Sequence, residues 1–135
     1  MTDIRFSLLS DTCRPLLDKF YREHRSPMRA VSQGQRWVAK QSQIVGALCL
    51  TPVAHGHWLT GLFVAPPMRG QAIARRLISH ALEPLAGPVW LFCHPDLLTF
   101  YQQSGFEPAT DLPSPLADKF MRYSRSKPLI ALIKL

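Results

Sequence analysis

Cysteine is scarce in this sequence, and its spacing excludes two kinds of site. Cys13, Cys49 and Cys93 stand far apart, form no C-x-x-C pair and are odd in number. A disulfide framework and a zinc knuckle both need closely patterned cysteines, so the sequence predicts neither. No set of His, Asp and Glu has metal-ligand spacing either, so we expect no metal site. Reduced thiols favour a cytoplasmic protein.

Long apolar runs are also missing. The longest, such as residues 44–50 and 129–133, fall far below the roughly 18 residues that span a bilayer. The first residues, MTDIRFSLLSDTCR, carry an acid and an arginine before a short apolar run, which is unlike a signal peptide. The sequence therefore predicts no membrane association and no targeting segment.

Acidic residues are few. Nine Asp and Glu stand against sixteen Lys and Arg, which gives a net charge of +7. Such a surplus favours a polyanionic partner: nucleic acid, an acidic membrane surface or a phosphorylated small molecule. The sequence has no RNP aromatic motif, helix-turn-helix pattern or zinc spacing, so a nucleic-acid partner is disfavoured.

The length and hydrophobic pattern predict one α/β domain. The 135 residues are 47% apolar, enough for a core of their own. Hydrophobic periodicity predicts strands over residues 4–9, 36–40, 43–52, 58–64, 88–93 and 129–134. Helices are expected after Pro15, over residues 73–82 and over residues 96–104. The proline-rich segment 109–120 is expected to be a loop, residues 121–123 a short strand, and Gly46 a bulge.

The most informative segment is LFVAPPMRGQAIARRLI, residues 62–78, where a strand ends and a glycine-containing turn opens a helix. Backbone N–H groups in a first helical turn have no intrahelical acceptor and lie at the positive end of the helix dipole. A pyrophosphate can accept several of them together, and Arg69, Arg75 and Arg76 add positive charge. The same residues also fit a plain strand-turn-helix with basic capping.

This segment resembles the acyl-CoA signature of the GNAT-type N-acetyltransferase superfamily, which is Gln or Arg, two residues, Gly, one residue, then Gly or Ala. Arg69, Ala72 and Ala74 stand at the three defined positions. A second segment, FYQQSGF at residues 100–106, resembles the family's F-Y-x-x-x-G-F motif. One position departs from the pattern: Ala72 keeps its N–H but adds a methyl group where the ligand passes closely, which bears on CoA affinity and not on the fold.

The resemblance implies a single-domain α/β GNAT-like fold over residues 1–135. Its central sheet is mixed and mostly antiparallel, has a splayed parallel strand pair and is flanked by helices. The resemblance also implies acetyl-CoA as co-substrate and direct attack by a primary amine of a small molecule or peptide. The residues expected to contact CoA are Leu62, Phe63, Val64, Arg69, Gly70, Gln71, Ala72, Ile73, Ala74, His94 and Tyr101.

Acyl transfer to an amine needs a neutral nucleophile, an oxyanion stabiliser and a proton for the departing thiolate. The resemblance implies that a backbone N–H near Phe63 or Val64 binds the oxyanion. It also implies that Tyr101 protonates the sulfur of CoA. The alternative is that the ring of Tyr101 only packs against neighbouring apolar residues. The base is open, because Thr60 stands where relatives often carry glutamate. The candidates are His57 and His55, then Glu23 and His24, although all four also fit ordinary surface residues.

Three other functions would use parts of the same sequence. A cysteine hydrolase built on Cys93 and His94 is disfavoured, because adjacent strand residues point to opposite faces. A non-catalytic acyl-CoA-binding regulator is the alternative function, since Thr60 removes the expected base. A nucleic-acid module ranks third, because the three phosphate groups of CoA account equally well for the charge.

The acceptor and the assembly stay open. Arginines at positions 22, 25 and 29 fit either an acidic group on the acceptor or a solvated loop. A monomer and a homodimer are both compatible with the sequence. The apolar run LIALIKL fits an internal strand better than a dimer edge.

Overall fold

The computed structural model describes residues 3–135, which form two compact units. The first unit comprises residues up to Thr51 together with Leu59–Leu85, and the second comprises Pro52–Trp58 together with Ala86–Leu135. The strands are β1 (Arg5–Leu8), β2 (Gln35–Lys40), β3 (Ile44–Val53), β4 (Gly56–Val64), β5 (Val89–Cys93), β6 (Glu107–Pro108) and β7 (Ile130–Lys134). The α-helices are α1 (Arg14–Glu23), α2 (Ile73–Leu82), α3 (Leu98–Gln102) and α4 (Ser114–Ser124).

The strands form a mixed sheet of seven in the order β1-β2-β3-β4-β5-β7-β6. Strands β4 and β5 are parallel, pairing His57 with Val89 and Trp58 with Trp90. The pairs β1–β2, β2–β3, β5–β7 and β6–β7 are antiparallel. This is the predicted α/β class with a parallel pair in a mostly antiparallel sheet.

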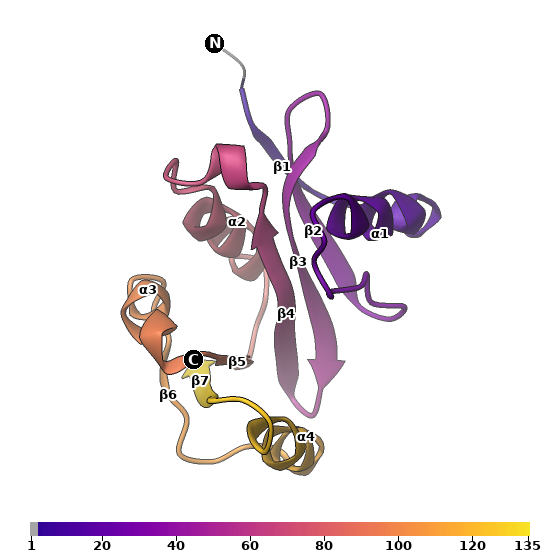
Figure 1. Ribbon diagram of the computed structural model, residues 1–135. Coiled ribbons are helices and arrows are strands. Elements are labelled where there is room, and N and C mark those ends of the chain that lie inside the picture. The colour runs from indigo at the N-terminus through magenta and orange to yellow at the C-terminus, as the bar shows by residue number, and fades with distance from the viewer. Residues whose placement is uncertain (1–2) are drawn as a thin grey trace. The chain divides into compact units, whose positions relative to one another are not determined.

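In the first unit, α1 and α2 cover opposite faces of the strands (Figure 1). Helix α1 buries Leu17, Phe20 and Tyr21 in one cluster with Val38 and Ala47 of the sheet. Helix α2 buries its own apolar stripe and contacts β1 and β2. Ten-residue helices are marginal alone in water, so this packing is what holds both helices in place.

The β2–β3 hairpin carries the irregularity that Gly46 was expected to mark. Its register shifts between Ala39 and Lys40: Ala39 faces Gly46, whereas Lys40 faces Ile44. The extra residue is therefore Val45, directly beside the glycine. The bulge is confirmed to within one residue.

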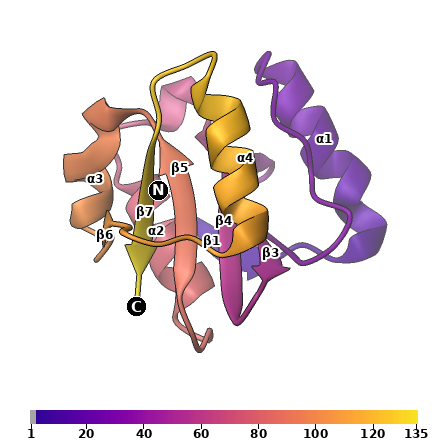
Figure 2. The same cartoon turned by 90° about the horizontal axis from the view of Figure 1, so that it is seen from below.

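In the second unit, β5 and β7 run side by side between α3 and α4 (Figure 2). The ring of Phe92 on β5 packs edge-on against Phe120 of α4, with ring centroids 5.2 Å apart. Strand β7 lies between β5 and β6, so the apolar run near the C-terminus is an internal strand, as the sequence predicted.

The segment after β6 is where sequence reasoning was wrong. Residues 114–124 form α4, whereas a proline-rich loop and a short strand were expected. Pro115 lies in the first helical turn, where a missing N–H costs nothing, so this proline starts a helix and does not break one. Leu116 and Phe120 then lie on one helix face, four residues apart.

None of the helices found in residues 3–135 is both long enough and apolar enough to cross a bilayer.

Candidate functional site

The turn between β4 and α2 has the geometry expected of an anion site. Two turn hydrogen bonds, Met68 N–H to Ala65 O (2.8 Å) and Arg69 N–H to Pro66 O (3.2 Å), close the first part of the turn. The first helical bond of α2 runs from Arg76 N–H to Ala72 O (3.0 Å). Residues 73–75 precede that bond, so their N–H groups have no acceptor within the helix. Gly70 and Gln71 are exposed beside these groups.

Ala72 adopts a backbone conformation that suits glycine. Its φ is 58° and its ψ is 23°, in the left-handed region. A residue with a Cβ loses about 1–2 kcal/mol there. The departure from the glycine of the family pattern therefore costs conformational energy, in addition to placing a methyl group in the turn.

Two of the three arginines near this turn already have partners. Arg69 donates from Nε to Val64 O at 3.0 Å, and its guanidinium lies 5.2 Å from the ring centroid of Phe63. The guanidinium of Arg76 lies 4.8 Å from the ring centroid of Phe6. Arg75 is exposed. All three guanidinium groups keep their positive charge near the start of α2. In addition, Arg69 links the turn to β4 and Arg76 links α2 to β1.

The end of β4 is shaped by a glycine that sequence reasoning missed. Gly61 has φ 68°, and its carbonyl accepts a hydrogen bond from Tyr21 Oη at 2.7 Å. A Cβ at position 61 would lie 2.7 Å from that hydroxyl oxygen, so a larger residue would both strain the backbone and displace the hydroxyl. Burial, and next the nearby Cys49 thiol, raise the pKa of Tyr21, which therefore stays a hydrogen-bond donor. An isolated glycine inside an apolar strand is typical of a backbone irregularity, and Gly61 carries this signal as Gly46 does.

Phe63 and Val64 point to opposite faces, as alternation predicts. The ring of Phe63 lies 5.9 Å from Phe20 and 5.8 Å from His24, both on the α1 side. Val64 is buried on the face where Gly46 also meets α2. Leu62 is half-buried. The carbonyl of Val64 is engaged by Arg69, which fixes the strand end beside the turn.

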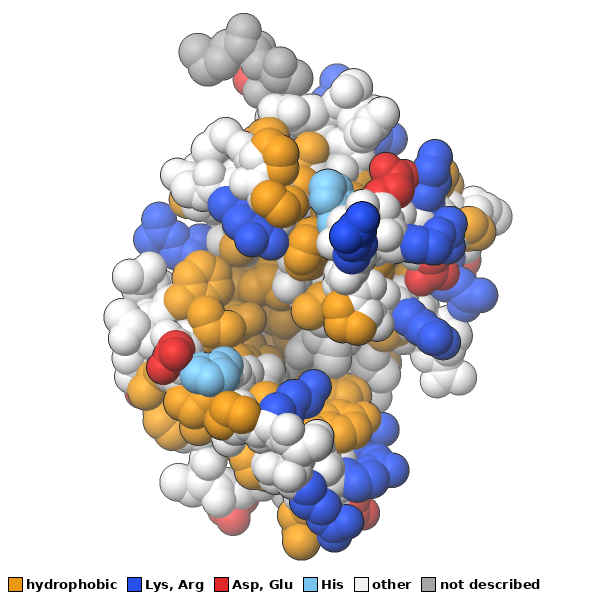
Figure 3. Space-filling view, viewed as in Figure 1, with side chains coloured by type: hydrophobic (Ala, Val, Ile, Leu, Met, Phe, Trp, Pro, Cys, Tyr) orange, Lys and Arg blue, Asp and Glu red, His pale blue; other side chains and the backbone are white. Residues whose placement is uncertain are grey.

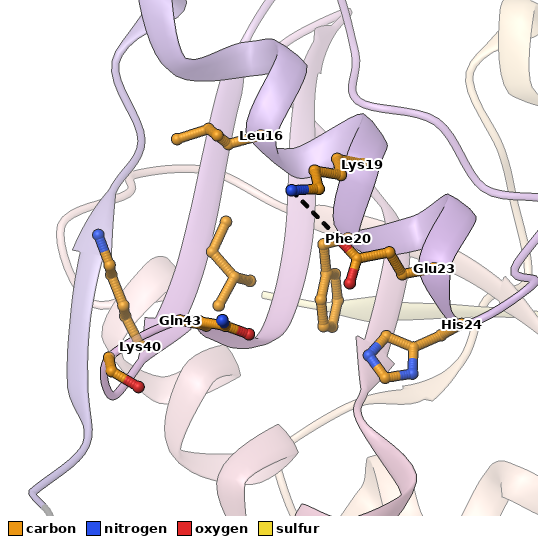
Figure 4. Close-up of a pocket in the computed structure, with 9 residues that line it drawn as sticks. Leu16, Lys19, Phe20, Glu23, His24, Lys40 and Gln43 are labelled. Atoms are coloured by element: carbon orange, nitrogen blue, oxygen red, sulfur yellow. Dashed lines mark ion pairs between the residues drawn. The ribbon is translucent and has the colours of Figure 1, made fainter.

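A small pocket lies between α1 and the β2–β3 hairpin (Figure 4). Its volume is about 270 Å³. Glu23 lies 3.8 Å from Lys19 across the rim, and His24 lines the same pocket while its ring contacts Phe63. Two of the base candidates, Glu23 and His24, thus share one pocket, and His24 adjoins the end of β4. The full lining is Leu16, Lys19, Phe20, Glu23, His24, Lys40, Ser42, Gln43 and Ile44.

Tyr101 lies in the second unit, on α3, with 7% of its surface exposed. Its ring packs edge-on against Phe100 and Phe106, at centroid distances of 5.0 Å and 5.8 Å. Burial, and next the charge of Cys93, raise its pKa. The phenol is therefore protonated throughout the physiological range, which a proton donor requires.

Cys93 and His94 do not form a nucleophile–base pair. Burial raises the pKa of the Cys93 thiol from its ordinary value of 9.0 to about 11, so the thiolate is scarce at neutral pH. His94 Nδ1 instead accepts a hydrogen bond from Asp96 N–H at 3.0 Å. Both observations oppose a cysteine hydrolase.

His57 and His55 lie at or just before the start of β4. The backbone N–H of His57 donates to Pro88 O at 3.0 Å, and among the described residues its buried Nδ1 finds no hydrogen-bond partner. His55 packs edge-on against Trp90 at 5.5 Å. His57 belongs to the second unit, whereas Phe63 belongs to the first. Residues 3–135 contain no group of three metal-ligating side chains.

A family model described as an acetyltransferase (GNAT) domain matches residues 32–108. The chain belongs to the GNAT acetyltransferase family. No curated protein sequence matches the chain. Among solved structures, an acetyltransferase of the GNAT family from Staphylococcus aureus Mu50 has a TM-score of 0.66 and 20% identity, with 98% of each chain covered.

Two further GNAT structures were determined with ligands. Arabidopsis thaliana Naa50, in complex with the bisubstrate analogue CoA-Ac-MVNAL, has a TM-score of 0.71 and 16% identity, with 98% of each chain covered. Escherichia coli YhbS, in complex with CoA, has a TM-score of 0.65 and 20% identity, covering 79% of this chain and 70% of that one. At such identities these likenesses show the fold.

The contact between Gly61 and Tyr21 generates a first prediction. Gly61→Ala is expected to lower the free energy of unfolding by about 2–3 kcal/mol, combining left-handed strain with the hydroxyl clash. In a Tyr21→Phe background the clash is absent and the same substitution should cost only about 1–2 kcal/mol. Urea unfolding of the four proteins measures both values. Equal costs in the two backgrounds would contradict the contact.

The strained turn generates a second prediction: replacing each of two nearby alanines by glycine changes the free energy of unfolding in opposite directions. Ala72→Gly is expected to raise the free energy of unfolding by about 0.5–1 kcal/mol, because glycine relieves the positive φ. Ala74→Gly, inside α2, should lower it by about 1 kcal/mol. Thermal unfolding gives the two shifts, and shifts of the same sign would rule out strain at Ala72.

The Cys93 thiol generates a third prediction, on alkaline stability. Between pH 9 and about 11 the unfolded chain has lost a thiol proton that the folded chain retains. The contribution of Cys93 to the free energy of unfolding is therefore complete below pH 9. Above pH 9 this contribution falls by about 1.4 kcal/mol per pH unit. Cys93→Ala should flatten the decline of stability over this range. Denaturant titrations from pH 8 to 11 test the difference, and parallel curves would refute it.

Proposed function

We propose that this protein is an N-acetyltransferase that transfers the acetyl group of acetyl-CoA to a primary amine. The observation that carries the proposal is the exit from β4, where a positive-φ turn opens onto the free N–H groups of α2 in a member of the GNAT family. The CoA and the bisubstrate analogue bound to YhbS and Naa50 support the choice of co-substrate.

The residues of the turn suit the pyrophosphate of acetyl-CoA. No described atom lies within 4 Å of the position that a Cβ on Gly70 would take, so ligand atoms can approach the backbone there. Gly70, Gln71, Ala72, Ile73 and Ala74 would supply backbone contacts. Arg69 would hold the turn against β4. The acyl arm of acetyl-CoA would be lined by Leu62, Phe63 and Val64. His94, at the end of β5, would supply a further contact with CoA. Acetyl-CoA supplies an activated thioester.

The proposed chemistry forms a C–N bond and breaks a C–S bond. A backbone N–H near Phe63 or Val64 donates to the carbonyl oxygen as negative charge develops on it. His24 or Glu23, or alternatively His57, takes the proton of the amine. Tyr101 gives its proton to the departing sulfur. Burial raises the pKa of Tyr101, so the phenol still carries its proton when negative charge develops on the sulfur.

A non-catalytic acyl-CoA-binding regulator is the second candidate. The strained, methyl-bearing Ala72 in the turn and Thr60 in place of an acidic residue favour it. The two functions differ in one assay. A regulator would bind acetyl-CoA without acetylating any amine in a broad panel, whereas the enzyme would acetylate at least one.

The role of Tyr101 generates the fourth prediction. Tyr101→Phe is expected to lower kcat by about 100-fold or more, because general acid catalysis contributes at least that much. The Kd for acetyl-CoA should stay within about twofold, since the hydroxyl serves the transition state and not binding. Because the pKa of Tyr101 is raised, loss of its proton should not reduce the wild-type rate up to about pH 10.

The matched control is Tyr123→Phe, an exposed tyrosine on α4 of the same unit. Its kcat should equal that of the wild type. An unchanged kcat for Tyr101→Phe at saturating substrates would remove the proposed acid while leaving the acetyltransferase function in place.

A further inference from the structure

A strongly basic groove runs between α1 and the loop that follows it. Its volume is about 820 Å³, and four arginines and one aspartate supply its charged lining: Arg14, Asp18, Arg22, Arg25 and Arg29. We call it the arginine groove. Lys and Arg side chains gather over α1 in the space-filling view (Figure 3).

The charge of the arginine groove is not neutralised from within its own unit. In the described part of the first unit, the neighbouring acidic residues form ion pairs with residues outside the groove: Glu23 pairs with Lys19, and Asp11 pairs with Arg36. The carboxylate of Asp18 accepts the N–H of Ala30 at 2.8 Å and so holds the loop in place. The groove therefore keeps three positive charges in excess.

Arg25 stands where the backbone favours glycine. Its φ is 55°, and it follows α1 in a capping pattern with Arg25 N–H on Arg22 O (3.0 Å) and Ser26 N–H on Tyr21 O (2.9 Å). The left-handed residue of such a cap is usually glycine, which adopts it without strain. The backbone conformation therefore does not account for the presence of an arginine at position 25. We infer that its guanidinium group has a role of its own.

We propose that the arginine groove binds acidic side chains of a polypeptide acceptor, an inference that rests on the proposed function. Guanidinium groups match carboxylates with two parallel hydrogen bonds each. Pro27, Met28 and Ala30 add apolar surface for a peptide chain. None of the described residues that line the groove is aromatic, so these residues provide no stacking platform of the kind that single-stranded nucleic acid uses.

The groove is built on the same end of α1 that reaches β4. Tyr21 holds the Gly61 carbonyl, and His24 contacts Phe63. Arg22 directly follows Tyr21 and Arg25 directly follows His24 in the sequence, and all four belong to the first unit. An acidic segment in the arginine groove would therefore lie on the helix end that also carries a base candidate.

The test compares two peptides on three proteins. Both peptides have ten residues and a free amino terminus, one with four glutamates at positions 3–6 and the other with glutamines there. Fluorescence anisotropy at 0.15 M salt, in the presence of CoA, measures binding without acetyl transfer. Wild-type protein should bind the glutamate peptide at least about tenfold more tightly.

Arg25→Gly is the decisive variant, because it removes the guanidinium and relieves the backbone. Its Tm should equal or exceed the wild-type Tm, while its affinity for the glutamate peptide falls about threefold to tenfold. Arg125→Gly is the control: it removes one positive charge at the end of α4, where φ is an ordinary −66°. Its affinity should stay within about twofold of the wild type.

Three results would overturn the groove proposal. These are equal affinity for the two peptides or binding of neither, unchanged affinity in Arg25→Gly, and displacement of the peptide by an equally tight single-stranded oligonucleotide. Acetyl transfer by the wild type is measured separately. Transfer to both peptides with equal kcat/KM would reject the groove and keep the acetyltransferase. Glutamate-dependent binding with no transfer to any amine of a broad panel would keep the groove as an acidic-peptide site and reject the acetyltransferase.

Discussion

The hydrogen bond from Tyr21 to the carbonyl of Gly61 is the contact on which the rest of the candidate site depends. A buried hydroxyl must find an acceptor, and here it finds one only because a left-handed glycine turns its carbonyl toward α1. The contact fixes the end of α1 against the end of β4. His24 and part of the arginine groove lie at that end of α1. Val64 and the turn before α2 come directly after that part of β4.

The first unit contains two strained backbone positions whose side chains are at least partly exposed to solvent. Ala72 opens α2 and Arg25 closes α1, and both have positive φ without being glycine. Stability alone would favour glycine at each position. The rest of the unit holds them there through a buried core that includes Leu17, Phe20 and Tyr21. Such strained positions are frequent where a protein binds ligands, which is the role proposed for both.

The sequence predicted much of the fold because its strands and first helices carry clear periodicities, and because two ordered motifs agreed on one family. It failed at α4, where Pro115 is read as a loop signal although it lies in a first helical turn. It also missed the role of Gly61, whose hydrogen-bond partner Tyr21 lies 40 residues away in the sequence. The predicted contacts of Arg69 with CoA stay a prediction. The arrangement as one domain stays a prediction.

The bond between Arg69 and the carbonyl of Val64 has a mechanical consequence. It joins the turn before α2 to the last residue of β4, so a displacement at one end is transmitted to the other. In an acetyltransferase, attraction between the turn and the distant phosphates would then help to align the reacting carbonyl with the strand. Affinity gained far from the thioester would thus be converted into rate at the thioester itself.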